Sequence, residues 1–493
     1  MARDLVSQLL SMGSSDQQIA ISSRSGDLTY GDLELRTRDI ARTLQSLGSQ
    51  TGDRIGTVMA KSVDAVTVFL GILRAGCVAV PINPQQPAAM MERIIVASDV
   101  QLVLHDVGLS VPNVPGKRRE TLGQAGPGSF DELIRNYVPS GREHATLLDE
   151  DADALILFTS GTTGDPKGVL HGIKSLLSTA TSLAKTWGLT SHDTVLHALP
   201  INHAHGLVIA TLPVLASGGN LRWIEAFEPR TVLEAMHGSS IFMGVPFYYQ
   251  QLLDSPAFDP HAFSTLRLCV SGSAPLSDAL ANRFRTETQH EIAQRYGMTE
   301  TMITTANPCE AIRFGTVGQA LPETDIRIVD TSTRATLEPG EIGEVVVSGP
   351  TVFKRYLRSE LQTNDLELNT GDLGRLDADG YLTLVGRVRD LIIYCGMNVY
   401  PSDVESALLQ CAGVHDACVF GIPHNLTGES VMAAVVAKPD QTVAPSELRK
   451  KLASLLAPHQ IPKRILVVPE IPRNNMGKPM RSELASNAKN LGG

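Results

Sequence analysis

The chain has 493 residues, of which 43% are hydrophobic and 19% are charged, and its formal net charge is −10. One hydrophobic core rarely supports a chain of this length, so we expect at least two domains. The negative charge argues against a dedicated nucleic-acid-binding protein. No uninterrupted apolar run reaches the roughly 18 residues of a membrane helix, so no membrane span is expected.

The six cysteines are scattered and form no CxxC pair. This usage is typical of reduced thiols and argues against a cysteine-based zinc site or a disulfide framework. The N-terminal stretch MARDLVSQLL carries an early acid and only a short apolar run, so it lacks the organisation of a signal peptide. We therefore expect a cytoplasmic enzyme.

Helical and strand patterns alternate through the first hundred residues. The apolar residues between Leu33 and Leu47 share one helical face, and Gly48 follows as a C-cap. DRIGTVMA (53–60) predicts a strand, VDAVTVFLGILRAG (63–76) a helix, and VAVPIN (78–83) a buried strand. This alternation predicts a parallel sheet covered by helices.

A segment at about 107–145, richer in Gly, Pro and charge, is expected to be a loop-rich crossing. The strand ALILF (154–158), a Gly- and Thr-rich loop and a helix over 173–187 follow it. Further strands are expected at TVLHAL, SSIFMG, LRLCVSG and EIAQRYG. From about residue 325, the shorter strands DIRIVD, GEVVVSG and YLTLVGR predict a β-rich subdomain.

The last hundred residues predict a compact α+β unit, and GRVRD (386–390) marks the candidate boundary. We place the domains at 1–388 and 389–493. The second contains an expected helix over 401–410, strands at DACVFGI, VMAAVVAK and RILVV, and a helix that begins near Pro445 and presents Leu448, Leu452, Leu455 and Leu456. The expected fold is therefore α/β, with a large N-terminal domain of doubly wound, parallel-type sheets, a β-rich subdomain and a small α+β domain.

The stretch FTSGTTGDPKGV (158–169) is typical of a phosphate-binding loop. It is not a Walker loop, because Lys167 is neither preceded by Gly nor followed by Ser or Thr, and it contains no G-x-G-x-x-G. Successive backbone N–H groups can still form a nest for phosphate oxygens. The competing interpretation is a polar turn between a strand and a helix. The candidate phosphate-binding residues are Thr159, Ser160, Gly161, Thr162, Thr163, Gly164 and Lys167.

This loop resembles the signature loop of the AMP-forming adenylating superfamily, which includes acyl-CoA synthetases, adenylation domains of peptide synthetases and luciferases. The resemblance continues over most of the chain, in the order of the family, through LPINHAHG (199–206), MGVP (243–246), SGSAPL (271–276), RYGMTET (295–301), NTGDLG (369–374), GRVRD (386–390), GMNVYPSDVE (396–405) and NNMGK (474–478).

The resemblance implies a reaction in two steps. A carboxylate attacks the α-phosphorus of ATP and expels pyrophosphate, and the thiol of coenzyme A then displaces AMP from the acyl adenylate. The acid is already ionised at neutral pH and needs no general base, so the catalyst must neutralise charge and align the reactants. The implied cofactors are ATP, Mg²⁺ and coenzyme A.

The resemblance also assigns residues. Glu300 would hold Mg²⁺ and Thr299 would contact phosphate. The alternative is that RYGMTET is an ordinary turn after a strand. Lys478 would bridge the acyl carboxylate and the phosphate in the first step; taken alone, it would be a solvated lysine. Asp372 would bind the ribose hydroxyls, and Arg387 the ribose or the phosphates. The adenine and the acyl carboxylate would be lined by Gly272, Ser273, Ala274, Tyr296 and Gly297.

For the second step, the resemblance implies that the small domain is mobile and turns about a hinge inside GRVRD, at Arg389. Cys395 and Gly396 would line the coenzyme A tunnel. Most relatives carry Gly-Gly there, so Cys395 is a departure. We interpret it as a small buried thiol.

The identity of the acid depends on the acyl pocket. The resemblance implies that His203, Phe247, Ser273 and Thr304 line this pocket, with His203 at the gate position. LPINHAHGL most resembles the malonyl-CoA synthetase branch. A dicarboxylate would require a fixed cation, preferably Arg, but Gln250 and Gln251 follow the MGVP motif.

Arg283 and Arg285 are more simply explained as surface residues. We therefore expect a small or medium aliphatic or aryl monocarboxylate, and malonate stays as the alternative. Loading of a carrier protein instead of coenzyme A is a second alternative, and a homodimer is allowed for.

Overall fold

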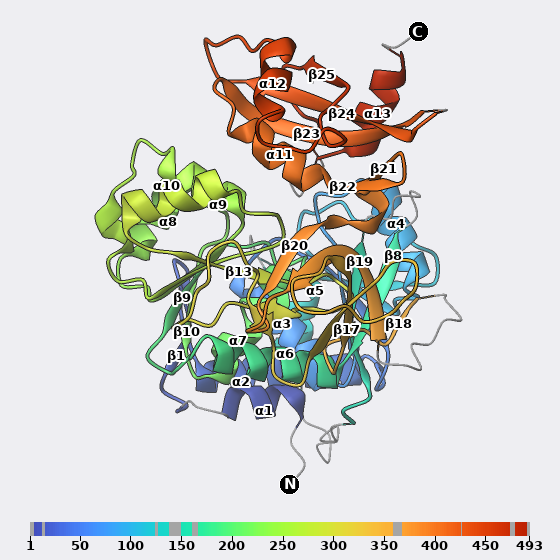
Figure 1. Cartoon of the computed structure of the whole chain (residues 1–493). Helices are drawn as coiled ribbons and strands as arrows, with labels where there is room; N and C mark the ends of the chain where they lie inside the picture. Colours follow the sequence, from blue (N-terminus) through green and yellow to red (C-terminus); the bar gives the residue numbers. More distant parts are fainter. Residues whose placement is uncertain are drawn as a thin grey trace. The chain divides into compact units, whose positions relative to one another are not determined.

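The computed structural model describes residues 4–11, 15–123, 127–137, 149–159, 166–357, 367–424, 426–473 and 479–490 (Figure 1). Two compact units are present, one of residues 1–325 and 347–368 and one of residues 326–346 and 369–493. The boundary predicted between residues 388 and 389 stays a prediction.

The helices of the first unit alternate with its strands. They are α1 (Leu5–Ser11), α2 (Tyr30–Ser46), α3 (Val63–Arg74), α4 (Ala88–Ala97), α5 (Ser129–Asn136), α6 (Ile173–Thr186), η1 (His205–Ile209), α7 (Leu212–Ala216), α8 (Pro229–Met236), α9 (Pro246–Leu253), η2 (Pro260–Phe263) and α10 (Asp278–Thr288). Those of the second unit are η3 (Val388–Asp390), α11 (Pro401–Leu409), α12 (Pro445–Leu452) and α13 (Arg481–Asn490).

The strands of the first unit are β1 (Ile19–Ser23), β2 (Gly26–Thr29), β3 (Arg54–Val58), β4 (Val78–Pro81), β5 (Leu102–Asp106), β6 (Arg118–Leu122), β7 (Asp153–Thr159), β8 (Lys167–Gly172), β9 (Thr194–His197), β10 (Asn220–Trp223), β11 (Ile241–Gly244), β12 (Leu268–Ser271), β13 (Ile292–Tyr296), β14 (Thr305–Ala306), β15 (Gln319–Ala320) and β18 (Arg355–Tyr356). Those wholly or mostly in the second unit are β16 (Asp325–Val329), β17 (Gly343–Ser348), β19 (Glu367–Leu376), β20 (Leu382–Arg387), β21 (Ile392–Tyr394), β22 (Met397–Val399), β23 (Val414–His424), β24 (Gly428–Ala437) and β25 (Arg464–Val467).

Two sheets organise the first unit. One has the strand order β15-β14-β13-β12-β11-β9-β10-β1-β2 and the other the order β18-β8-β7-β4-β3-β5-β6. Most inner pairs, such as β11 with β12 and β3 with β4, are parallel. Antiparallel strands close both ends of the first sheet and the β18 end of the second, whereas β6 at its other end pairs parallel to β5. The predicted α/β class with parallel-type sheets is confirmed.

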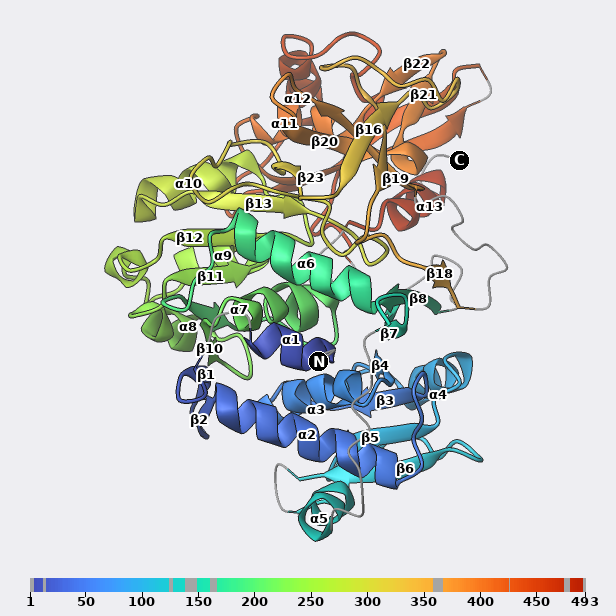
Figure 2. The same cartoon turned by 90° about the horizontal axis from the view of Figure 1, so that it is seen from below.

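A layer of helices lies between the two sheets. The largest core cluster combines buried residues of α1, α2, α3, α6 and α7 with residues of both sheets, and Figure 2 shows α1, α2, α3 and α7 between them. Separate clusters join α4 to one outer face and α8, α9 and α10 to the other. Apolar side chains are thus buried on both faces of each sheet, as the continuous apolar strands predict.

The predicted first helix shows how local chemistry sets an element. In α2, Thr29 and Asp32 form a reciprocal capping box at the N-terminus, and Leu33, Ile40 and Leu44 are buried on one face. Gly48 follows the helix with a φ of +91°, which glycine adopts without strain. The helix and its C-terminal glycine are as the sequence predicts.

Three local expectations are wrong. The crossing at 107–145 contains β6 and α5. The loop after β7 does not lead straight into a helix, because β8 comes first and pairs antiparallel with β7. The helix that begins at Pro445 ends at Leu452, which leaves Leu455 outside it and 41% exposed.

The second unit also has two sheets. The strands β16-β17-β19-β20 form the predicted β-rich part. The C-terminal part has the order β22-β21-β24-β23, and β25 pairs parallel to β24. Helices α11 and α12 share a core cluster with β23, β24 and β25, and α13 packs in another. The predicted α+β character is confirmed.

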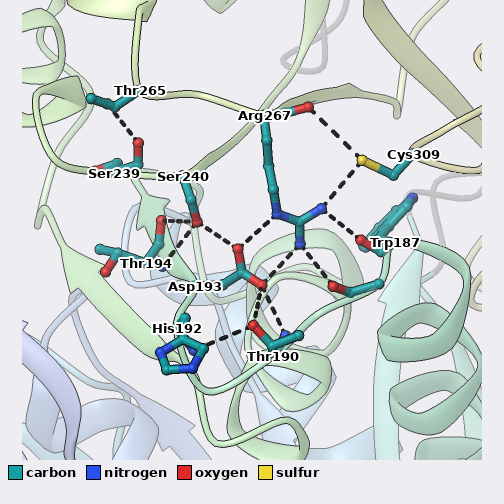
Figure 3. A network of polar contacts seen from close by, with 11 residues as sticks. Trp187, Thr190, His192, Asp193, Thr194, Ser239, Ser240, Thr265, Arg267 and Cys309 are labelled. Atoms are coloured by element: carbon teal, nitrogen blue, oxygen red, sulfur yellow. Dashed lines mark hydrogen bonds and ion pairs between the residues drawn. The ribbon is translucent and has the colours of Figure 1, made fainter.

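A network of hydrogen bonds and ion pairs connects the amino ends of three parallel strands of the first unit (Figure 3). The Arg267 guanidinium, just before β12, donates to both carboxylate oxygens of Asp193, just before β9, at 2.8 and 2.9 Å. It also donates to the carbonyls of Trp187 and Gly188, and Ser240, before β11, donates to Asp193. Every charged group in this network has a partner, which is what a buried polar cluster requires.

Candidate active site

The predicted phosphate loop joins two paired strands. Thr159 ends β7 and Lys167 begins β8, and the two residues are direct partners in the antiparallel register. Gly168 comes next, where a side-chain Cβ would lie 2.5 Å from the Leu357 Cδ1, so a larger residue would have to displace the Leu357 side chain. Ser160, Gly161, Thr162, Thr163 and Gly164 lie outside the described residues. The pairing of β7 with β8 therefore brings Thr159 and Lys167 side by side.

The turn that carries Thr299 and Glu300 is fixed from two sides. On one side the Nε2 atom of His171 lies 2.6 Å from the carbonyl oxygen of Thr299. Because a carbonyl only accepts, Nε2 carries the proton. Burial lowers the pKa of His171 to about 4, so the ring is neutral at pH 7. On the other side the Phe353 N–H donates to the Glu300 carbonyl at 2.7 Å.

The Glu300 side chain is suited to a magnesium ion. Glu300 is 8% exposed, and its Oε1 accepts a hydrogen bond from the Tyr356 hydroxyl at 2.9 Å. No ion pair neutralises it in the part of the chain that the structure describes. The same residues contain no group of three His, Cys, Asp or Glu side chains able to cage a metal. Mg²⁺ is usually held by one or two carboxylates together with waters and substrate phosphates, so a single carboxylate at this position is compatible with it.

A buried arginine lies behind the ends of β12 and β13. Arg295, in β13, is 6% exposed, and its Nη2 is 3.4 Å from the hydroxyl oxygen of Ser273. At Gly272 an added Cβ would lie 2.3 Å from the Arg295 Nε, so glycine makes room for the guanidinium. Among the described residues, Nε has no hydrogen-bond partner and no carboxylate pairs with this arginine. Burial lowers the pKa of Arg295 to about 9, which keeps it charged at pH 7.

Two histidines of the LPINHAHG motif approach the same place. The Nδ1 atom of His205 lies 3.2 Å from the Ser273 hydroxyl oxygen, and its buried Nε2 has no partner among the described residues. Burial, followed by the charge of Arg295, lowers the pKa of His205 well below its usual value. Burial also lowers the pKa of His203. Both rings are therefore neutral at pH 7 and able to donate one hydrogen bond each to an anion.

The backbone at this point is strained. Ser273 has a φ of +70°, which is uncommon for a residue other than glycine and is found mostly at functional sites. The site lies at the carboxyl ends of parallel strands, where α/β sheets bind ligands.

The remaining predicted residues of the first unit differ in exposure. Thr304 is buried, and its hydroxyl donates to that of Thr301 at 3.0 Å. Tyr296 is 7% exposed at the end of β13. Gly297 comes next, where a Cβ would lie 2.0 Å from the Met302 carbonyl. Ala274 is half-buried. Phe247 is 59% exposed at the start of α9, and its predicted role in the acyl pocket stays a prediction.

In the second unit, the two residues predicted for the ribose end of the nucleotide are partners. Asp372 in β19 and Arg387 in β20 face each other in the antiparallel register. The Arg387 Nε lies 2.8 Å from the Asp372 Oδ1, and Asp372 is 6% exposed. The arginine therefore orients the carboxylate from one side. Lys478 lies outside the described residues.

The predicted tunnel residues form the turn between β21 and β22. Cys395 and Gly396 have φ values of +51° and +78°, and Tyr394 pairs with Met397 on either side. Two positive φ values are the mark of a tight I′ hairpin turn, in which glycine is preferred. The interpretation of Cys395 as a buried thiol is wrong, because it is exposed. A turn at a hairpin tip projects away from its sheet.

Sequence reasoning did not select Arg295, Tyr356 or His171. A charged residue inside the apolar strand EIAQRYG was the available signal for Arg295. Tyr356 and His171 carry no comparable signal, because their partners are far away in the sequence. Neither residue belongs to a motif named in the sequence analysis, although His171 lies shortly after the stretch 158–169.

Comparison with known families identifies the family of the chain. Residues 12–357 match the model of the AMP-binding enzyme family, and residues 403–478 match that of the AMP-binding enzyme C-terminal domain. Because the first match alone covers most of the chain, the chain belongs to this family of adenylate-forming enzymes.

Similar proteins narrow the class. The chain is 32% identical to a malonate–CoA ligase of Arabidopsis thaliana, covering 90% of this chain and 80% of the relative. It is 30% identical to a sulfoacetate–CoA ligase of Cupriavidus necator, covering 96% and 95%. The crystal structure of ATP-bound MatB from Rhodopseudomonas palustris superposes with a TM-score of 0.92 at 34% identity over 100% of both chains.

The protein is accordingly an ATP-dependent, AMP-forming acid–CoA ligase. Its substrates are a carboxylic acid, ATP and coenzyme A. Among the described residues, no helix has both the length and the apolar character required to cross a bilayer.

Proposed function

We propose that the acid activated by this ligase is a small acid with a second anionic group, of the malonate class. The observation that carries the proposal is Arg295, a buried guanidinium beside Ser273 and His205 that lacks a carboxylate partner among the described residues. The names of the malonate–CoA and sulfoacetate–CoA ligases support it, since both acids combine a short chain with two anionic groups.

The physical argument concerns the cost of an unpaired charge. A buried ion without a partner costs several kcal/mol, and proteins keep such groups where a ligand supplies the counter-charge. A guanidinium donates two parallel hydrogen bonds to a carboxylate, which gives both attraction and orientation. The free Nε of Arg295 and the free Nε2 of His205 are donors that a second carboxylate would satisfy.

A monocarboxylate, which the sequence favours, would leave these donors unpaired. Its apolar tail would have to lie against a guanidinium, and no anionic group would offset the desolvation of that charge. The second anionic group therefore accounts for more of the observed geometry.

In the first step of the reaction, different residues of this chain would neutralise different parts of the negative charge of ATP and the acid. The loop around Thr159 and Lys167 holds the phosphates, and Thr299 contacts them. Glu300 holds Mg²⁺, which when bound neutralises phosphate charge. Lys478 bridges the acyl carboxylate and the α-phosphate.

The rest of the site positions the reactants. Asp372 and Arg387 hold the ribose, and the residues around Tyr296 line the adenine. His203 stands at the acyl gate. In the second step Cys395 and Gly396 face the pantetheine arm, after the small domain has turned about Arg389. Within this proposal we keep the cytoplasmic location, the homodimer and the boundary at 388/389 as predictions.

The test is pyrophosphate release with ATP and coenzyme A over a panel of acids. Malonate, methylmalonate and sulfoacetate are compared with acetate, propionate, butyrate and benzoate. The expected result is a kcat/KM for malonate at least about a hundredfold above that for propionate, because a buried charge pair is worth about 2–5 kcal/mol.

Arg295→Gln provides the internal check. Malonate activity should fall by about a hundredfold or more, while propionate activity stays the same or rises, since the penalty against an apolar tail is removed. Arg283→Gln is the matched control, because Arg283 pairs with Asp254 and Glu287 on the surface. A wild-type preference for propionate or benzoate, or an equal loss for both acids in Arg295→Gln, would overturn the proposal.

A further inference from the structure

We infer that Tyr356 is a positioning residue for the metal-side carboxylate, linking Glu300 to the strand that carries Lys167. Its hydroxyl donates to the Glu300 Oε1 at 2.9 Å, and its ring lies under the Lys167 ammonium, with 5.9 Å between Nζ and the ring centroid. The role assigned to Tyr356 rests on the proposed metal role of Glu300 and is independent of which acid is activated.

The direction of the hydrogen bond is fixed by charge. An ionised carboxylate only accepts, so the phenol is the donor. The phenol hydroxyl therefore occupies Oε1 of Glu300.

The ring itself has little freedom. Tyr356 pairs with Val169 in the ladder between β18 and β8, and the Leu357 N–H donates to the Gly168 carbonyl at 2.8 Å. Phe353 packs against the ring, with centroids 4.6 Å apart. The same segment holds the Glu300 backbone through the Phe353 N–H. Residues 353–357 thus bind both the strand of Lys167 and the turn of Glu300.

The consequence is a carboxylate with one oxygen occupied and one to offer. Among the described residues no hydrogen bond or ion pair engages the Glu300 Oε2. A partner that orients a metal-binding carboxylate typically contributes tenfold or more to metal affinity. The Lys167 ammonium lies at cation–π distance from the same ring, so Tyr356 contacts both Glu300 and the lysine that begins β8.

Tyr356→Phe removes the hydroxyl and keeps the ring. With ATP and acid saturating, the Mg²⁺ concentration for half-maximal pyrophosphate release should rise about tenfold. The rate at saturating Mg²⁺ should change by less than about twofold, because the ion restores the site once it is bound.

A second readout does not depend on turnover. Mg²⁺ should raise the thermal midpoint of the wild-type protein above that with ATP alone, and this added rise should shrink in Tyr356→Phe. Tyr30→Phe is the matched control. The Tyr30 hydroxyl is also buried and donates to the Gly219 carbonyl at 2.8 Å, so its loss tests the general effect of deleting a buried phenol hydroxyl.

A double-mutant cycle tests whether Tyr356 affects Mg²⁺ binding through Glu300. If Tyr356 acts through Glu300, adding Tyr356→Phe to Glu300→Gln should leave the Mg²⁺ dependence of the single Glu300 variant unchanged. An unaltered half-saturating Mg²⁺ concentration in Tyr356→Phe overturns the role of Tyr356 alone, as does a further tenfold rise in the double variant. An unaltered Mg²⁺ dependence in Glu300→Gln overturns the metal role of Glu300 as well. The acid panel is unaffected by either result.

Discussion

Two arginines at opposite ends of neighbouring parallel strands of the first unit have opposite surroundings. Arg267 precedes β12, and Arg295 lies near the end of β13. Arg267 bonds both oxygens of Asp193 and two backbone carbonyls (Figure 3), whereas Arg295 makes one contact of 3.4 Å, to Ser273, within the described chain.

The comparison shows at which end of the strands an arginine side chain lacks a charged partner among the described residues. Hydrogen bonding to Asp193 raises the pKa of Arg267, while burial lowers that of Arg295. The first arginine stands at the amino ends of the strands, where it holds the sheet together. The second stands at the carboxyl ends, where α/β proteins bind ligands. In this unit the ion-paired Arg267 belongs to the scaffold, whereas the buried Arg295, which has no carboxylate partner among the described residues, lies beside the candidate site.

The largest expected effect is on stability, from breaking the satisfied network. Asp193→Asn should lower the free energy of unfolding by about 3 kcal/mol, because it leaves the partly buried Arg267 without its counter-charge. Thermal unfolding measures the loss. Asp254→Asn is the control, since its pair with Arg283 is solvent-exposed and should be worth less than about 1 kcal/mol. Equal shifts in the two variants would contradict the scaffold role.

His171 provides a comparison based on the pH dependence of stability. His171 has partners on both ring nitrogens, the Thr299 carbonyl and the Ser175 hydroxyl, and burial lowers its pKa to about 4. Its unfolded pKa is near 6.5, so the unfolded state binds a proton first. Stability is therefore full above pH 6.5 and falls between pH 6.5 and 4, by up to about 3 kcal/mol. The thermal midpoint of His171→Gln should fall less over this range, and parallel curves would refute the assignment.

The unsatisfied arginine should respond in the opposite direction to Arg267. Without acid, Arg295→Gln should leave the thermal midpoint unchanged or raise it, by about 1 kcal/mol in stability, because an unpaired buried charge is removed. The added protection that malonate gives the wild type should disappear. A large loss of stability in the absence of acid would show that Arg295 belongs to the scaffold.

The smallest effect concerns the hairpin tip. Cys395 occupies a left-handed position in which glycine carries no steric penalty, so Cys395→Gly should stabilise the second unit by at most about 1 kcal/mol. Thermal unfolding compared with Cys411→Ala, which removes a buried thiol and should destabilise, gives the contrast. A loss of stability in Cys395→Gly would mean that the side chain makes a contact of its own.

Sequence patterns predict the fold class well, and the site in part. Alternating apolar runs gave most strands of both units, since a buried parallel strand is apolar throughout. They missed β8, because its residues follow the loop without a strong pattern. The motif RYGMTET indicated Glu300 and contained Arg295, but only the surroundings of Arg295 distinguish it from Arg283 and Arg285. The roles predicted for individual residues stay predictions.

The sequence by itself determined the residue types available and most of the order of elements: a Gly- and Thr-rich loop, a carboxylate in RYGMTET, a lysine near the end of the chain, and helices capped by their own residues. These depend on neighbours within a few positions, so the pattern carries them. The tertiary structure decided which charge has a partner. Asp193 meets Arg267, Tyr356 meets Glu300 and Gly272 makes room for Arg295 across long stretches of chain, and only strand pairing brings those groups together.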